Sequence, residues 1–114
     1  MSNCIFCKIV RAEIPAKIVH RDDRVTAFHD INAQAPTHIL IVPNAHIRGA
    51  DEITAAHAET VTAMFTVANA LAESHGIAAS GYRLVFNVGS HAGQSVFHLH
   101  LHLLGGRYMA WPPG

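Results

Sequence analysis

The spacing of apolar residues divides the first part of the chain into short β-favouring segments. Residues 17–21 and 25–29 flank the turn-forming pair Asp22-Asp23, and this arrangement predicts a hairpin. A continuous apolar run over 38–43 has the pattern of a buried third strand. These patterns predict three strands that are joined by short connections.

Two helices are predicted around these strands. Residues 4–13 favour a short helix that ends before Pro15. A long helix is expected from Thr54, which can cap its start, to Gly76, which can end it in a left-handed turn. The apolar residues between them recur at helical spacing, namely Val61, Met64, Phe65, Ala68, Leu71 and Ala72.

Two more strands, over 82–88 and 96–104, complete the prediction, and the proline-rich tail 109–114 is expected to be irregular. The order is helix, three strands, helix, two strands, with mostly tight connections. This order favours an α+β fold with a five-stranded antiparallel sheet, one short helix and one long helix. A chain of 114 residues fits a single domain over 1–114.

Composition narrows the class of protein. Hydrophobic residues make up 50% and charged residues 14%, and Lys plus Arg equals Asp plus Glu at 8 each. The balanced, scattered charge argues against a nucleic-acid partner or a membrane surface. The longest aliphatic run, 39–42, is too short to cross a bilayer. The start of the chain lacks a secretory pattern, and two cysteines cannot build a disulfide framework, so we expect a cytoplasmic protein.

Ten histidines stand out, and three of them alternate with leucines. In a strand, His98, His100 and His102 share one face, about 6.5–7 Å apart, while the leucines face the core. Neighbouring imidazoles disfavour each other's protonation, so at least one is expected to stay neutral and nucleophilic. A merely amphipathic strand is a poor explanation for three histidines. Metal binding would need further ligands, because side chains of one strand do not converge.

The loop 89–95, directly before these histidines, contains two glycines and Ser95. Glycine lets main-chain N–H groups approach an anion closely, and a serine adds a hydroxyl. A glycine-containing loop alone is a weak signal. Next to three imidazoles it predicts attack by histidine on phosphorus.

Residues 94–104 match the signature His-φ-His-φ-His-φ-φ, where φ is apolar, and resemble the histidine-triad family. The chain is most similar to its Hint branch, the histidine-triad nucleotide-binding proteins. Supporting stretches extend the resemblance over essentially the whole chain: 14–17, 27–31, 35–38, 104–107 and 111–114. Ala92 stands where this branch often has glycine.

The resemblance implies a purine nucleoside phosphoramidase, an enzyme that hydrolyses a P–N bond and releases AMP or GMP and an amine. It makes His100 the nucleophile, which forms a nucleotidyl-histidine intermediate. Ser95 would bond to the leaving nitrogen or a phosphate oxygen, and His102 would contact the phosphate. Neither magnesium nor an organic cofactor is expected.

The resemblance also implies a nucleotide site. Asp30, with Ile31, would bind the ribose hydroxyls, which a carboxylate accepts well. Asn87, Gly93 and Gln94 would hold ribose or phosphate. The base pocket would consist of Phe6, Ile14, Phe28 and Ile31, whose apolar members are also plausible core residues. His38 is expected either to support His100 or to be an ordinary structural histidine.

Cys4 and Cys7 form a CxxC pair, which by itself fits a redox pair, a buried structural pair or a metal site. Similar bacterial proteins bind zinc through two cysteines, a later histidine and the first triad histidine. The resemblance therefore implies a structural zinc on Cys4, Cys7, His46 and His98. His98 would then brace the strand that carries His100 and would not be a free base.

The resemblance further implies a homodimer in which two sheets join into one. Trp111 is a large apolar residue on the irregular tail, which suits docking on a second chain. Two other functions stay open: a dinucleoside polyphosphate hydrolase or nucleotidyl transferase of the same superfamily, and a nucleotide- or zinc-binding regulatory module.

Overall fold

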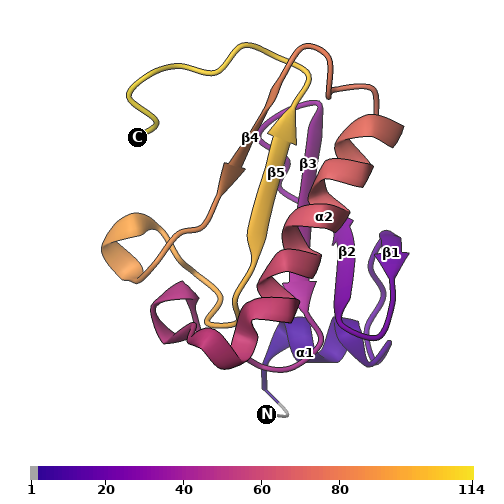
Figure 1. Ribbon diagram of the computed structural model, residues 1–114, viewed down its shortest axis with the longest axis vertical. Helices are drawn as coiled ribbons and strands as arrows, with labels where there is room; N and C mark the ends of the chain where they lie inside the picture. The colour runs from indigo at the N-terminus through magenta and orange to yellow at the C-terminus, as the bar shows by residue number, and fades with distance from the viewer. Residues whose placement is uncertain (1–2) are drawn as a thin grey trace.

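The computed structural model describes residues 3–114, and in it five antiparallel strands form one sheet in the order β1-β2-β3-β5-β4 (Figure 1). The elements in chain order are α1 (Ile5–Val10), β1 (Ile18–Arg21), β2 (Val25–His29), β3 (Thr37–Pro43), α2 (Ala58–Ser74), β4 (Tyr82–Val85) and β5 (Leu101–Gly105). Three short 3₁₀ helices join them: η1 (Ala50–Glu52), η2 (Ala55–His57) and η3 (Ser90–Ala92). The predicted fold, with one short helix, one long helix and five strands, is confirmed.

The two faces of the sheet carry different layers. The long helix α2 lies across one face (Figure 1) and packs on alternate strand residues such as Ile39, Ile41 and Leu101. On the opposite face, Phe6 and Ile9 of α1 belong to a second, smaller apolar cluster. Because side chains alternate along a strand, the histidines beside Leu101 and Leu103 point toward the α1 face.

The ends of α2 follow the predicted signals. The Thr54 hydroxyl accepts a hydrogen bond from the Ala56 N–H and so caps η2, the 3₁₀ turn that leads into the helix. Gly76, with φ of +74°, follows the last turn in the left-handed region that glycine adopts without steric cost. Within the described residues 3–114, no helix is long and apolar enough to cross a membrane.

The last two strands are shorter than predicted. β4 ends at Val85, and β5 begins only at Leu101, so the strand prediction is wrong over 86–88 and 96–100. The pairing of β5 with β3 stops at Ile41, shortly before β3 ends at Pro43. The segment before β5 is held by other contacts, including the bond from the Leu99 N–H to the Ile47 carbonyl, at 2.6 Å.

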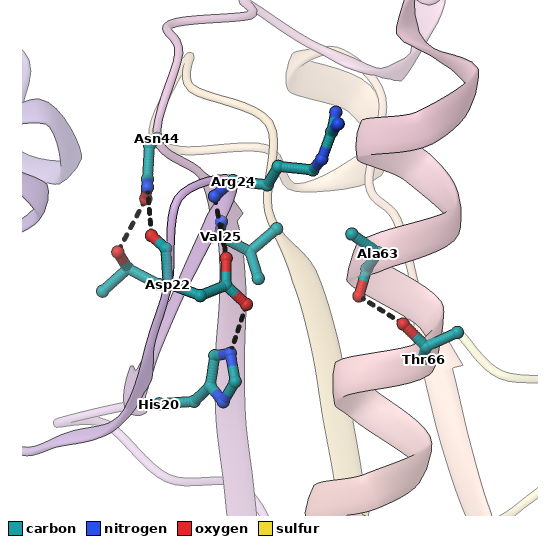
Figure 2. A network of polar contacts seen from close by, with 8 residues as sticks. His20, Asp22, Arg24, Val25, Asn44, Ala63 and Thr66 are labelled. Carbon is teal, nitrogen blue, oxygen red and sulfur yellow. Dashed lines mark hydrogen bonds and ion pairs between the residues drawn. The ribbon is translucent and has the colours of Figure 1, made fainter.

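A polar network closes the hairpin between β1 and β2 (Figure 2). The Asp22 carboxylate accepts hydrogen bonds from the N–H groups of Arg24 and Val25 and contacts the His20 ring at 2.6 Å. The hydrogen bond from His20 is the main reason that the pKa of Asp22 falls to about 2. This network lies on the protein surface and fixes the turn that the Asp22-Asp23 pair predicts.

Candidate active site and metal centre

A cavity of about 370 Å³ opens on the α1 face of the sheet. Its wall contains residues from α1, the following loop, β2, β3 and the segment around β5. Of the residues expected to bind nucleotide or to react, eight line it: Phe6, Ile14, Phe28, Asp30, Ile31, Ser95, His100 and His102. The fold therefore brings a hydroxyl, a carboxylate and two imidazoles to one apolar cavity.

Three expected nucleotide-binding residues, Asn87, Gly93 and Gln94, are not part of that cavity wall. The Gln94 side chain is buried and is used internally. Its amide oxygen accepts a hydrogen bond from the Gly89 N–H at 2.9 Å, and its amide nitrogen donates to the Arg48 carbonyl at 3.0 Å. Gln94 thus supports the loop that leads to Ser95, a role that the sequence pattern did not indicate.

The ring of His100 has a defined orientation. Its Nδ1 lies 2.8 Å from the main-chain carbonyl oxygen of His98, which can only accept, so Nδ1 carries a proton. In the neutral ring, Nε2 then holds a free lone pair. The edge of the Phe6 ring packs against the imidazole, with 5.1 Å between ring centroids, and only 8% of His100 is exposed. His100 is therefore a buried, oriented imidazole that can act as a nucleophile.

His38 and His102 form a second ordered pair. The Gln34 main-chain N–H donates to His38 Nδ1 at 3.0 Å, so the proton of the neutral His38 ring is on Nε2. That nitrogen lies 2.9 Å from His102 Nδ1 and donates to it. The proton of the neutral His102 ring is therefore on Nε2.

His102 Nε2 is buried and has no hydrogen-bond partner among the described residues. Burial, with smaller contributions from His100 and His38, lowers the pKa of His102 to about 4, so the ring is neutral near pH 7. Burial also lowers the pKa of His38. A buried N–H without a partner is costly, and here it belongs to a residue of the cavity wall. It suits an oxygen atom of a bound anion.

Asp30 stands beside this pair. One carboxylate oxygen accepts a hydrogen bond from the Asn32 N–H at 2.8 Å, and the other lies 3.4 Å from His38 Nε2. Asp30, His38 and His102 are close enough to be considered as metal ligands. The proton on His38 Nε2 argues against that use, because a ligating nitrogen needs its lone pair.

The other cluster consists of the four residues expected to bind zinc, Cys4, Cys7, His46 and His98, whose donor atoms all lie within 4.8 Å of one another. His98 Nδ1 is 3.3 Å from Cys4 Sγ, 3.5 Å from Cys7 Sγ and 3.2 Å from His46 Nδ1. Zinc–sulfur and zinc–nitrogen bonds of about 2.3 and 2.0 Å give tetrahedral donor separations in this range.

The chemistry of this cluster also fits a metal ion. His98 Nε2 donates to the Pro43 carbonyl at 2.8 Å, which leaves the Nδ1 lone pair directed at the thiols. Burial lowers the pKa of His98, so its ring is neutral. Burial, and then the neighbouring Cys4, raise the pKa of the Cys7 thiol, so the thiol keeps its proton until a divalent cation binds and displaces it. The four residues can hold a closed structural zinc.

The fold and these two histidine clusters are features by which a protein family can be identified, and comparison with known proteins names that family. The HIT domain matches residues 11–109. The chain belongs to the HIT family.

Individual relatives cover almost the full length. The purine nucleoside phosphoramidase of Escherichia coli K12 is 55% identical over 103 residues, which are 90% of this chain and 87% of that protein. The 14 kDa zinc-binding protein of Zea mays is 47% identical over 115 residues, covering 99% of this chain and 89% of that protein. A HIT family hydrolase from Legionella pneumophila Philadelphia 1 superimposes with a TM-score of 0.97 at 51% identity, covering 98% and 100% of the chains.

Proposed function

We propose that this protein hydrolyses the P–N bond of purine nucleoside 5′-phosphoramidates and releases AMP or GMP and an amine. The observation that supports it most is that His100 and His102 line one cavity, the first with a free Nε2 lone pair and the second with a buried Nε2–H that has no partner among the described residues. The first can attack phosphorus, and the second can bind a phosphoryl oxygen. The 55% identity to an enzyme named for this reaction supports the same conclusion.

The cavity can hold the nucleoside in one orientation. The purine would lie against Phe6, Ile14 and Phe28, which provide apolar and aromatic surface. Asp30 would accept hydrogen bonds from the ribose hydroxyls, while Ile31 at the exposed mouth would flank the base. Binding energy from these contacts would place the phosphorus beside His100 for in-line attack.

In the first step, His100 Nε2 forms a bond to phosphorus as the P–N bond of the substrate breaks. The nitrogen leaves as an amine that has gained a proton from solvent, and we place the Ser95 hydroxyl at that nitrogen as the group that passes the proton on. The His102 N–H donates to a phosphoryl oxygen as negative charge shifts onto the oxygens. His98 keeps the ring of His100 oriented through its carbonyl.

In the second step, water attacks the nucleotidyl-histidine, the bond from phosphorus to His100 Nε2 breaks, and a proton returns to solvent. AMP or GMP leaves, and His100 regains its lone pair. No group is consumed, so one cycle converts the phosphoramidate and one water into nucleotide and amine. Gln94, by holding the loop before Ser95, would keep that hydroxyl at the cavity.

We further propose that Cys4, Cys7, His46 and His98 bind a structural zinc. When bound, zinc supplies a fixed crosslink between α1, the segment after β3 and the segment that carries the nucleophile. That crosslink matters because residues 96–100 have no strand partner in the sheet. Because the chain itself would supply all four ligands, no position on the ion would be left for substrate.

We also propose that two copies associate through their β4 edges into one continuous sheet. β4 is an edge strand with free pairing groups along one side. Beside it, Phe65 of α2 is 38% exposed and packs against Phe86, and Trp111 of the tail is 83% exposed. The Arg83 side chain donates to the Ala110 carbonyl and holds the tail near β4. Sedimentation analysis would find a monomer if this proposal is wrong.

The decisive test measures AMP release from an adenosine 5′-phosphoramidate by the protein as purified and by the His100→Ala variant. Loss of the nucleophile should reduce kcat by ~10²-fold or more. The His20→Ala variant serves as control, because His20 lies in the surface network of the β1–β2 hairpin (Figure 2). Mass spectrometry of the quenched reaction should find the nucleotidyl group on His100.

Three outcomes would contradict the proposal. Equal turnover by His100→Ala and the unmodified chain would exclude His100 as nucleophile. Faster cleavage of a P–O–P bond in a dinucleoside polyphosphate than of the P–N bond would assign the chain to the other reaction. AMP binding without turnover of either substrate would indicate a binding module.

A further inference from the structure

The segment Gly105-Gly106-Arg107 begins at the last residue of β5 and lies outside the cavity wall, and neither the triad nor the nucleotide pocket explains it. Each of these three residues lies close to another part of the chain. A Cβ on Gly105 would come within 2.5 Å of the Ile77 side chain. A Cβ on Gly106, whose φ is +92°, would lie 2.9 Å from Pro36. Because glycine has no side chain, this segment can lie close to the loop after α2 and to the 30–36 loop.

Arg107 continues this approach with hydrogen bonds. Its Nε and Nη2 both donate to the main-chain carbonyl of Gln34, at 3.1 and 2.9 Å, and its Nη1 donates to the Tyr108 carbonyl at 2.9 Å. Among the salt bridges of the described residues, none involves Arg107. The guanidinium is therefore used to clamp one residue of the 30–36 loop rather than to pair with a carboxylate.

The clamped residue is the one that sets the tautomer of His38. Gln34 is held by its carbonyl, and its N–H donates to His38 Nδ1. His38 Nε2 in turn donates to His102 Nδ1, which leaves the proton of His102 on Nε2, a buried atom without a partner among the described residues. A continuous chain of contacts thus runs from Arg107 through Gln34 and His38 to His102.

We propose that Arg107 is a positioning residue that, by clamping Gln34, acts with the Asp30 carboxylate 3.4 Å from His38 Nε2 to fix the proton of His102 on Nε2. Without the clamp, the Gln34 N–H is no longer held in position to donate to His38 Nδ1, and the His38 ring can carry its proton on Nδ1. His38 Nε2 then accepts, His102 donates from Nδ1, and a lone pair on His102 Nε2 faces the cavity. A phosphoryl oxygen would meet repulsion there instead of a hydrogen bond. The consequence for turnover rests on the proposed function, whereas the tautomer does not.

The first measurement needs no substrate. Nitrogen-15 chemical shifts of His102 distinguish its two tautomers, and they should show Nε2–H in the unmodified chain. In Arg107→Ala they should move toward a mixture with the Nδ1–H form, and Arg107→Lys, which keeps one cationic donor, should restore most of the original shift. The matched control is Arg21→Ala, because Arg21 also donates from its guanidinium to a main-chain carbonyl, that of Ile9, at 3.2 Å.

The second measurement separates this role from simple placement of the loop. Loss of the His102 donor should lower kcat about tenfold, a fraction of what removing a transition-state donor outright costs. If the clamp only placed Asp30 and Ile31, its loss would raise KM and leave kcat and the His102 tautomer unchanged. That result would overturn the proposal. Circular dichroism confirms that each variant is folded, and Arg107→Gln replaces Arg107→Ala if the latter is not.

The two measurements fail independently. If the His102 chemical shifts change in the Arg107 variants but even the unmodified chain does not turn over phosphoramidate, the positioning role stands and the proposed function is wrong. If turnover is normal in the unmodified chain and the His102 shifts are the same in all variants, the proposed function stands and the positioning role is wrong.

Discussion

Two clusters flank His100, and each contains two histidines, but the protons of these histidines are placed in opposite ways. In the metal cluster, His98 donates outward to the Pro43 carbonyl and turns a lone pair toward the two thiols. In the cavity cluster, His38 accepts from the Gln34 N–H and turns its N–H toward His102. The main-chain group on the outer nitrogen therefore decides whether the inner nitrogen binds a cation or donates a proton.

This difference teaches how one short sequence serves two purposes. Imidazole is the same chemical group at all these positions, and its ordinary pKa is near neutrality. Burial keeps His38, His98 and His102 neutral, because it lowers the pKa of each. Tautomers then become fixed by hydrogen bonds, and they separate a structural metal site from a site for anion chemistry. Each prediction below tests one side of that separation.

The largest expected effect comes from breaking the metal cluster. Cys7→Ser should reduce zinc from about one ion per chain to well below one, because a thiolate ligand is lost. Zinc at a free concentration 100 times its dissociation constant stabilises the folded chain by about 2.7 kcal/mol. Loss of zinc binding therefore lowers the free energy of unfolding by about that amount. Elemental analysis and thermal unfolding measure both quantities. Unmodified protein that holds far less than one zinc, without chelator treatment, would contradict the zinc proposal.

The next effect comes from breaking the cavity cluster. His38→Phe keeps a ring but removes both hydrogen bonds, so His102 is no longer held in one tautomer. We expect kcat for the phosphoramidate to fall about tenfold, less than the loss of a transition-state donor outright, because His102 still adopts the donating tautomer part of the time. Zinc content should stay unchanged, since His38 lies outside the metal cluster. A parallel loss of zinc would show that the two clusters are not independent.

A smaller effect is expected from pH. The pKa of His102 is about 4 in the folded chain, below its ordinary value of 6.5, because burial disfavours the charged ring. Between these values the unfolded chain binds more protons, so stability is full above about pH 6.5 and falls as pH decreases toward 4. His102→Gln should therefore lose less in Tm between pH 7 and pH 5 than the unmodified chain does.

The control for that pH experiment is His91→Gln, since His91 is exposed on the short helix η3. Its Tm should change with pH as the unmodified chain does. An equal change of Tm in His102→Gln would mean that His102 is not held neutral by burial, and the donor role assigned to it would lose its support.

The smallest effect is expected far from both clusters. Arg24 forms an ion pair with Glu59 at the surface, where solvent screens the charges. Arg24→Gln should change the free energy of unfolding by less than about 0.5 kcal/mol. Zinc content and kcat should not change. A large loss of zinc or turnover in this variant would indicate that variants affect the two clusters through general loss of structure.

Much of the fold could be predicted from local sequence. The β-favouring residues of 25–29 and the apolar run 38–43 indicated strands, and Thr54 and Gly76 indicated the ends of the long helix. These signals are local, because they depend on side-chain spacing, capping and glycine conformation. The alternation of histidine and leucine also predicted which side chains share a face.

The strand limits near the site could not be read from that alternation. Residues 96–100 have a strand-like pattern, yet β3 provides no partner for them beyond Ile41. The Leu99 N–H bonds to the Ile47 carbonyl instead, so pairing depends on the path of the chain in the assembled sheet. The contacts of Gln94 were likewise hidden, because an internal hydrogen bond leaves no periodic signal.

The sequence by itself determined the residue types of the site: three alternating histidines, a CxxC pair, a carboxylate and a serine. Only the tertiary structure decided which of these atoms face one another and which nitrogen of each ring carries the proton. Cys4 and His98 are 94 positions apart, and His38 and His102 are 64 apart. Tautomers depend on main-chain groups such as Pro43 O and Gln34 N–H, which every residue possesses and no side-chain pattern reveals.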